Sequence, residues 1–210
     1  MKIQYQLTIF FCFICILCIC FSCNKDYVNG TAASQKVDMT TYEYLKSKPG
    51  IFDSLVKLID RAGIKSLIDS SGQTFFALTN YSVDAYLTNK ETDLTRVSSD
   101  PFTTDSIDID TFKINITRYL FPNKIMRDSV ATGGRYYYNE NSTDSASYYV
   151  YLSSISGDVD FYYYFNSVSY LFFKKVYPSS SGSSVQFQTT DIITNTGVIQ
   201  VLPNSYTLFD

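Results

Sequence analysis

Residues Thr190 to Leu202 read T-D-I-I-T-N-T-G-V-I-Q-V-L, and this stretch decides the fold of the chain. A turn at Asn195-Thr196-Gly197 precedes the run V-I-Q-V-L. Gly197 lacks a Cβ atom, so it can adopt the positive φ that such a turn often requires. A turn followed by a run of branched apolar residues predicts a β-strand near the end of the sequence.

A second stretch, Thr74 to Asn80, reads T-F-F-A-L-T-N. Together with Thr190 to Leu202, it resembles the two signature segments of the fasciclin domain family. Residues 42–64 extend the resemblance, because Y-x-x-L, P-G, F-x-x-L and A-G-I are similar to the start of such a domain. The resemblance implies that the two stretches pair as central strands, with Phe76 and Ile199 buried. Leucine stands at position 78 where the family has proline, and glutamine at position 200 where it has histidine, so no histidine-dependent property is expected.

The chain is expected to be α+β, a fasciclin-like antiparallel β-sandwich (wedge) with helices packed mainly from the N-terminal half. Thr40 to Glu43 fits a capping box, and residues 52–59 repeat apolar side chains at helical spacing before Gly63. Asn80 is suited to cap the helix that follows it. Later in the chain the apolar period shifts to two, which predicts antiparallel strands. These strands are expected at residues 147–152, 159–165 and 168–172.

Three parts are predicted along the chain: a signal peptide at 1–22, a flexible tether at 23–37 and a fasciclin-like domain at 38–210. Lys2 precedes an apolar run from Leu7 to Phe21, which has the length of a signal-peptide core and is short for a transmembrane helix. A plain signal peptide cleaved elsewhere and an uncleaved anchor are the alternatives.

Cys23 follows Ser22 at the end of the apolar run, and this ending resembles a bacterial lipobox. The resemblance implies that Cys23 carries a lipid, which makes the membrane a partner of the protein. Residues 24–26 resemble a short tag that directs lipoproteins to the outer face of the cell. We therefore expect the protein on the bacterial outer membrane, lipid-anchored at the cell surface. All five cysteines lie at or before Cys23, so we expect no disulfide in the folded part.

Charge and composition exclude several classes of function. The chain has 17 basic and 20 acidic residues, a net charge of −3, and no histidine. Scattered cations create no field that would attract a phosphate backbone, so no nucleic-acid partner is expected. Histidine is the commonest general base and transition-metal ligand. We expect neither a cofactor nor a metal site.

Asp105, Asp108 and Asp110 lie close together in a loop rich in serine and threonine. Their spacing is similar to that of a calcium loop, but the glycine and the twelfth-position glutamate are missing. We interpret these residues as solvating or capping groups, and we expect no enzyme activity. Three triplets also resemble an acceptor for bacterial O-glycosylation, although chance produces such triplets in a chain rich in Asp and Ser. They are Asp105-Ser106-Ile107, Asp128-Ser129-Val130 and Asp144-Ser145-Ala146.

Residues 136–177 hold 11 of the 19 tyrosines in the chain. Alternation predicts that Tyr148 and Val150 face the core. It also predicts a contact surface of outward-facing rings at Tyr149, Tyr151, Tyr162 and Tyr164. Tyrosine suits such a surface because its ring supplies apolar area and its hydroxyl group a polar end. The alternative is that these tyrosines are strand formers with half-buried rings.

The expected function is that of a non-catalytic binding or adhesion domain, anchored in the cell envelope and contacting proteins, matrix or glycans. This expectation follows from the fasciclin resemblance and not from a recognised site. The alternative function is that of an accessory lipoprotein in an outer-membrane glycan-uptake or surface assembly. The sequence leaves the identity of the protein or glycan partner open.

Overall fold

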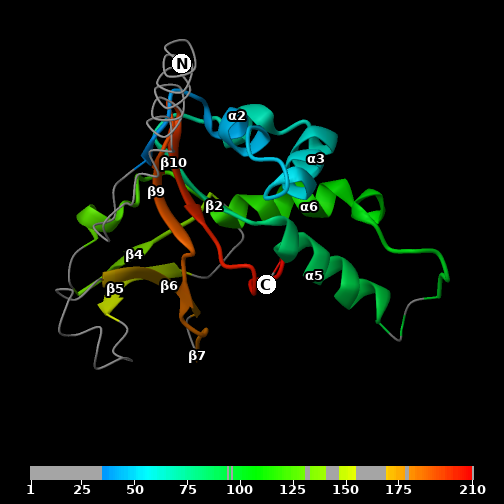
Figure 1. The fold of residues 1–210 in the computed structure, drawn as a ribbon. Coiled ribbons are helices and arrows are strands. Elements are labelled where there is room, and N and C mark those ends of the chain that lie inside the picture. Colours follow the sequence, from blue (N-terminus) through cyan, green and yellow to red (C-terminus); the bar gives the residue numbers. More distant parts are fainter. Residues whose placement is uncertain are drawn as a thin grey trace, which may run out of the picture. The chain divides into compact units, whose positions relative to one another are not determined.

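Helices occupy the first half of the described chain and most strands the second half (Figure 1). The computed structural model describes residues 35–93, 95, 97–130, 133–140, 147–154, 169–177 and 180–209. Its α-helices are α2 (Thr41–Lys46), α3 (Asp53–Ala62), α4 (Lys65–Ile68), α5 (Asn80–Glu91) and α6 (Ile109–Ile116). Its 3-10 helices are η1 (Thr104–Ser106), η2 (Thr117–Tyr119) and η3 (Arg127–Ser129). In the view of Figure 1 the α-helices gather to one side of β2 and β10, and strands β4 to β6 to the other.

The two signature segments form the centre of the first sheet, sheet A, whose strand order is β1-β9-β10-β2-β3. Strand β10 pairs with β2, and Ile199 lies opposite Phe75. All residues of both strands are buried, including Phe76 and Ile199. The expected pairing and burial are therefore confirmed. The strands of this sheet are β1 (Gln35–Lys36), β2 (Gln73–Ala77), β3 (Leu120–Phe121), β9 (Thr189–Ile193) and β10 (Gly197–Val201).

Sheet A is mixed, whereas the sequence predicted an antiparallel sandwich. Strand β10 runs parallel to β2, and β1 runs parallel to β9. The pairs β9–β10 and β2–β3 are antiparallel. Parallel neighbours need a long connection, and here all of α5, α6 and the second sheet lie between β2 and β10 in the chain. Strands β2 and β10 are buried at every position, and the order of apolar residues within each strand does not give the direction of its neighbour.

Gly197 is needed for close packing and not for a left-handed turn. It does not have a positive φ, and it lies within β10, opposite Gln73 of β2. A Cβ atom at this position would collide with the backbone carbonyl oxygen of Gln73. The glycine of the signature therefore lets the two central strands approach each other.

The second sheet, sheet B, is antiparallel and has the order β4-β5-β6-β7, with β8 also paired to β6. Strands β5 and β6 pair continuously from Ser147 opposite Val176 to Ser154 opposite Ser169. The predicted strand at 147–152 is confirmed, and the predicted strand at 159–165 lies outside the described residues. The strands of this sheet are β4 (Arg135–Tyr137), β5 (Ser147–Ser154), β6 (Ser169–Tyr177), β7 (Ser180–Ser181) and β8 (Val185–Gln186).

Buried phenylalanines join the two sheets. The ring of Phe76 in β2 lies 4.4 Å from Phe121, 4.7 Å from Phe187 and 5.4 Å from Phe173 of β6, measured between ring centroids. Each such pair contributes about 0.5–1.5 kcal/mol beyond the burial of its area. The α+β class, with helices beside two packed sheets, is confirmed.

Local signals set the ends of the first two helices. The Thr40 hydroxyl accepts a hydrogen bond from the Glu43 amide at 3.2 Å, and the Glu43 carboxylate accepts one from the Thr40 amide at 2.9 Å. This is the predicted capping box of α2. Helix α3 ends at Ala62 and is followed by Gly63, as predicted.

Asn80 caps α3 and not its own helix. Helix α5 begins after Thr79, and the Asn80 Oδ1 atom accepts a hydrogen bond from the Ser54 amide in the first turn of α3, at 2.9 Å. Ser54 has no upstream carbonyl partner in its own helix, because the first amides of a helix lack one. The asparagine therefore links α3 to the start of α5.

Residues 35 and 36 form β1 of sheet A and Val37 hydrogen-bonds to β9, although the sequence assigned all three to the tether. Gln35 of β1 lies opposite Ile192, and the Val37 amide donates to the Ile193 carbonyl at 2.9 Å. The open edge of β9 offers unpaired backbone groups, and these residues pair with it.

A buried polar pair ties sheet A to the segment after β3. The Gln200 side chain accepts a hydrogen bond from the Asp191 amide at 2.9 Å, and it donates to the Ile125 carbonyl at 2.6 Å and to the Asp191 carboxylate at 2.9 Å. That carboxylate also accepts from the Arg127 amide, at 3.0 and 3.2 Å. Both side chains are almost fully buried. Gln200 therefore has a structural role.

Candidate functional site

Strand β5 presents different aromatic residues to its two faces. Tyr148 and Val150 are buried against the core, and the Tyr148 ring lies 5.1 Å from Phe121. Tyr149 and Tyr151 lie on the opposite face and are half-buried. Tyr148 and Val150 therefore face the core as predicted, and Tyr149 and Tyr151 face the other side. Their half-buried rings match the alternative that they are strand formers, and a role in contact remains a prediction.

The opposite face carries a row of aromatic rings across three strands. Tyr136 of β4 lies opposite Tyr149, and Tyr151 lies opposite Phe172 of β6. Centroid distances along the row are 4.9 Å from Tyr136 to Tyr149, 5.5 Å from Tyr149 to Tyr151 and 5.6 Å from Tyr151 to Phe172. The last two pairs are stacked, with interplanar angles of 28° and 17°. We call this surface, with Lys174, the outer aromatic face.

Tyr149 is held in place by three different contacts. The Lys174 ammonium lies 5.4 Å from its ring centroid, and its hydroxyl donates a hydrogen bond to the Gly133 carbonyl. Gly134 packs against the same ring with φ +74°, and a Cβ atom there would lie 2.5 Å from Tyr149 Cζ. A ring fixed in this way loses little further entropy when a partner binds.

The sequence identified only part of this surface. Tyr162, Tyr164 and the proposed lipid-bearing Cys23 lie outside the described residues. Tyr136, Phe172 and Lys174 were not predicted as surface residues. Period-two alternation in β6 would have placed Phe172 and Lys174 on one face, but only the register of β5 with β6 brings them beside Tyr151 and Tyr149.

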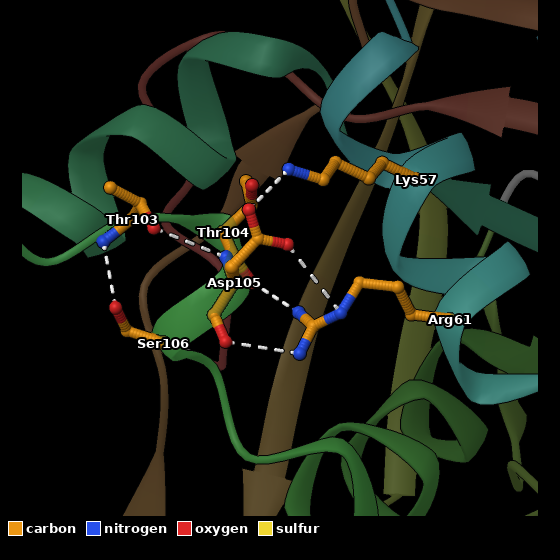
Figure 2. A network of polar contacts seen from close by, with 6 residues as sticks. All are labelled: Lys57, Arg61, Thr103, Thr104, Asp105 and Ser106. Atoms are coloured by element: carbon orange, nitrogen blue, oxygen red, sulfur yellow. Dashed lines mark hydrogen bonds and ion pairs between the residues drawn. The ribbon is translucent and has the colours of Figure 1, made fainter.

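Asp105 anchors a loop to helix α3 (Figure 2). Its carboxylate accepts a hydrogen bond from Lys57 at 2.7 Å and lies 3.7 Å from Arg61 Nε. Arg61 also donates to the backbone carbonyls of Thr104 and, at 3.0 Å, of Asp105. The hydrogen bond from Lys57, together with the charges of Lys57 and Arg61, holds the pKa of Asp105 below its ordinary value. The carboxylate is thus paired as part of the fold.

The other two aspartates of this loop also have structural partners. Asp108 caps α6 by accepting a hydrogen bond from the Thr111 amide at 2.7 Å, and hydrogen bonds from Thr111 lower the pKa of Asp108. Asp110 lies 3.7 Å from Lys113 of the same helix. The capping interpretation is confirmed for Asp108. Within the described ranges, no group of three or more His, Cys, Asp or Glu residues is arranged to hold a metal ion.

Two of the three triplets that resemble glycosylation acceptors lie in matching 3-10 turns. The Ser106 hydroxyl accepts a hydrogen bond from the Thr103 amide at 3.1 Å, and the Ser129 hydroxyl accepts one from the Met126 amide at 3.3 Å. Each hydroxyl therefore closes its own turn. The third triplet lies outside the described residues.

An open hollow of about 390 Å³ lies between α5 and the end of the chain. Tyr86, Lys90 and Asp93 line one side of it, and residues 207–209 line the other. It has two opposite charges and no convergent set of buried polar groups, so it lacks the features of a small-molecule site. In the part of the chain that is described, no helix combines the length and apolar character needed to cross a membrane.

No family model and no curated protein matches this sequence. Among solved structures, the chain is similar to a FAS1 domain pair from the insect cell adhesion molecule fasciclin I, with 9% sequence identity and a TM-score of 0.46. The match covers 76% of this chain and 46% of that chain. This chain thus spans less than half the length of the matched structure, and a likeness at this level carries no argument about function.

Proposed function

We propose that the chain is a non-catalytic binding domain of a cell-envelope lipoprotein. A lipid on Cys23 anchors it in the outer membrane, and the outer aromatic face contacts a protein or glycan at the cell surface. The observation that carries this proposal is the row of rings from Tyr136 to Phe172, on the face of sheet B opposite the core.

The composition of this face supports contact with a macromolecule. A sheet that packs on a core with one face usually places polar residues on the other. Here, Tyr136 remains 53% exposed and Tyr138, just after β4, remains 69% exposed. Clustered tyrosines of this kind supply contact area at low entropic cost.

A non-catalytic role is supported by the chemistry of the polar residues. The chain has no histidine. The three clustered aspartates at 105, 108 and 110 are engaged in ion pairs or a helix cap. Asp191, the buried carboxylate of sheet A, accepts hydrogen bonds from a backbone amide and from Gln200.

The contact role is tested by changing Tyr136 to Ser. Beads carrying the wild-type domain are expected to retain a component of the cell-envelope fraction, and beads carrying Tyr136→Ser are expected to lose most of it. Tyr81→Ser is the matched control, because Tyr81 is a 63% exposed ring on α5. Equal retention by all three proteins would contradict a contact role for this face, and so would no retention by any.

The anchor is tested separately by changing Cys23 to Ser. The variant is expected in the soluble fraction, because an acyl chain contributes about 0.8 kcal/mol per buried methylene to membrane binding. Persistence of the variant in the membrane pellet would overturn the lipid anchor. Protease access in intact cells then distinguishes the cell surface from the periplasm.

A further inference from the structure

We propose that Tyr136 and Tyr149 form a site of oxidative cross-linking on sheet B. A haem peroxidase with hydrogen peroxide joins their rings by a carbon–carbon bond, and the resulting dityrosine links the edge strand β4 to β5. This inference goes beyond the proposed function and does not depend on it. It rests on the register of the two strands, on the spacing and tilt of the two rings and on the exposure of Tyr136.

The two rings are close enough to couple. Tyr136 lies directly opposite Tyr149 in the antiparallel pair of β4 and β5. Their ring centroids are 4.9 Å apart, so carbon atoms of the two rings are in van der Waals contact. The ring planes are tilted by 53° to each other. This tilt suits the product, because the two rings of a dityrosine are twisted about the bond that joins them.

Tyr136 is the ring that meets the oxidant. It lies on the edge strand and is 53% exposed, whereas Tyr149 is half-buried. The first oxidation therefore forms a radical on Tyr136. An electron then passes from Tyr149 to this radical through the ring contact, with protons exchanged through water. Tyr136 is thereby restored and undergoes the second oxidation.

The reaction uses one equivalent of peroxide. The peroxidase removes one electron and one proton from each phenol, and hydrogen peroxide is reduced to two molecules of water. The two phenoxyl radicals form a bond between carbon atoms that are ortho to their oxygen atoms. The hydrogen atom on each coupling carbon then moves to the phenol oxygen, so the cross-linked protein has lost two hydrogen atoms in all.

Other tyrosine pairs in the described part of the chain fit this chemistry less well. Tyr149 and Tyr151 are 5.5 Å apart and stacked at 28°. The new bond lies in the planes of both rings, so rings stacked face over face must first turn. Tyr119 and Tyr206 are 6.2 Å apart, and both are buried, so an enzyme-sized oxidant does not reach them. Tyr136 and Tyr149 alone combine a short distance, a tilt and an exposed member among these pairs.

A bond at this position fixes a short edge strand. Strand β4 spans only Arg135–Tyr137, and it lies at the end of the strand order of sheet B. No cysteine follows Cys23 in the sequence, so a disulfide is not available for this purpose. A bond between Tyr136 and Tyr149 closes a loop of the unfolded chain, as a disulfide does. For a loop of about 15 residues, this raises Tm by about 6–12 °C in a domain of this size.

The experiment treats the purified, folded protein with a haem peroxidase and one equivalent of hydrogen peroxide. A glutamate-specific protease cuts after Glu140, which separates Tyr136 from Tyr149 along the chain. In the monomer fraction, mass spectrometry is expected to find the two resulting peptides joined, with the mass of two hydrogen atoms lost. Dityrosine fluorescence should rise together with this product. The reacted monomer should melt about 6–12 °C above the untreated protein.

Tyr136→Phe keeps the aromatic ring and removes the phenol, so this variant should give no joined peptides. Tyr138→Phe is the matched control, because Tyr138 is 69% exposed and lies just after the same strand. This control should form the product as the wild type does. Thermal melts before oxidation establish that each variant is folded.

Three results overturn the inference: the wild-type monomer gives no joined peptides, Tyr136→Phe still gives them, or cross-links form only between copies. A joined monomer that melts no higher than the untreated protein overturns the role of the bond in fixing β4. If no cross-link forms while envelope capture still depends on Tyr136, this inference falls and the proposed function stands.

Discussion

Replacement of Gln200 tests whether the buried polar pair holds sheet A to the segment after β3. The side chain makes three hydrogen bonds, to the Asp191 amide, to the Asp191 carboxylate and to the Ile125 carbonyl. Gln200→Leu removes all three in a position with 0% exposure. Each buried polar group left without its partner costs about 1–3 kcal/mol, and the larger apolar side chain offsets part of this. We expect a net loss of about 2–4 kcal/mol.

Gln200→Glu keeps the shape and changes the chemistry. It places one carboxyl oxygen where the amide nitrogen now donates to Ile125 and Asp191, so this oxygen would face two acceptors, the Ile125 carbonyl and the Asp191 carboxylate. The introduced carboxyl group is expected to retain a proton in the folded state, because burial and the nearby carboxylate raise its pKa. In the unfolded state the group ionises near pH 4.3. The folded state then binds more protons above that pH, so the free energy of unfolding falls as pH rises from about 5 to 8.

Urea unfolding followed by circular dichroism at pH 5 and pH 7.5 measures both effects. Gln188→Glu, at an exposed position between β8 and β9, is the control for added charge. A loss of 2–4 kcal/mol corresponds to a fall in Tm of about 5–15 °C for a domain of this size. The reasoning is refuted if Gln200→Leu unfolds within about 1 kcal/mol of the wild type. It is also refuted if Gln200→Glu and Gln188→Glu show the same dependence on pH.

Three further substitutions test other parts of the fold. Ile199→Asp places an unpaired carboxylate at a position with 0% exposure and should abolish cooperative unfolding; a normal melting curve would contradict the assigned register. The Tyr42 hydroxyl donates to Asp60 at 2.6 Å, which raises the pKa of Tyr42 to about 12. The stability that this hydrogen bond adds is complete below pH 10 and is lost as pH rises through 12. Tyr42→Phe should therefore reduce the fall of the free energy of unfolding at alkaline pH by one proton, as measured by urea unfolding at pH 9 and 11. Asn80→Ala should cost about 1 kcal/mol by leaving the Ser54 amide without its cap, and an unchanged Tm would show that water replaces the cap.

Local signals predicted what local forces determine. The capping box at Thr40 depends on residues three positions apart, and the structure contains it as predicted. Asn80 is also a typical capping residue, but its side chain accepts a hydrogen bond from the amide of Ser54, which lies in a different helix. A capping residue next to two helix starts can serve either, and only the packing of α3 beside α5 decides between them.

In the central strands, too, the sequence predicted one feature and the packing decided another. The two signature stretches were predicted to pair, and β2 and β10 do pair. Their parallel direction did not follow from the sequence pattern. A strand buried on both faces is apolar throughout, whether its neighbour runs parallel or antiparallel. Gly197 was assigned to a turn because the sequence alone does not show which residue lies opposite it. Its close approach to Gln73 is found only when the partner strand is known.

The residues of the outer aromatic face differ in how far their contribution to stability explains their presence. Tyr151 lies between Tyr149 and Phe172, and its two stacked pairs stabilise the sheet by about 0.5–1.5 kcal/mol each, so its presence is explained without a partner. Tyr136 has one ring contact in the row and remains 53% exposed, so stability accounts for less of its area. Lys174 contacts the Tyr149 ring, but a cation over an exposed ring contributes only about 0.5–1 kcal/mol to folding. A function at this face therefore depends on the exposed Tyr136 more than on the two stacked pairs, and Tyr136→Ser is the decisive substitution.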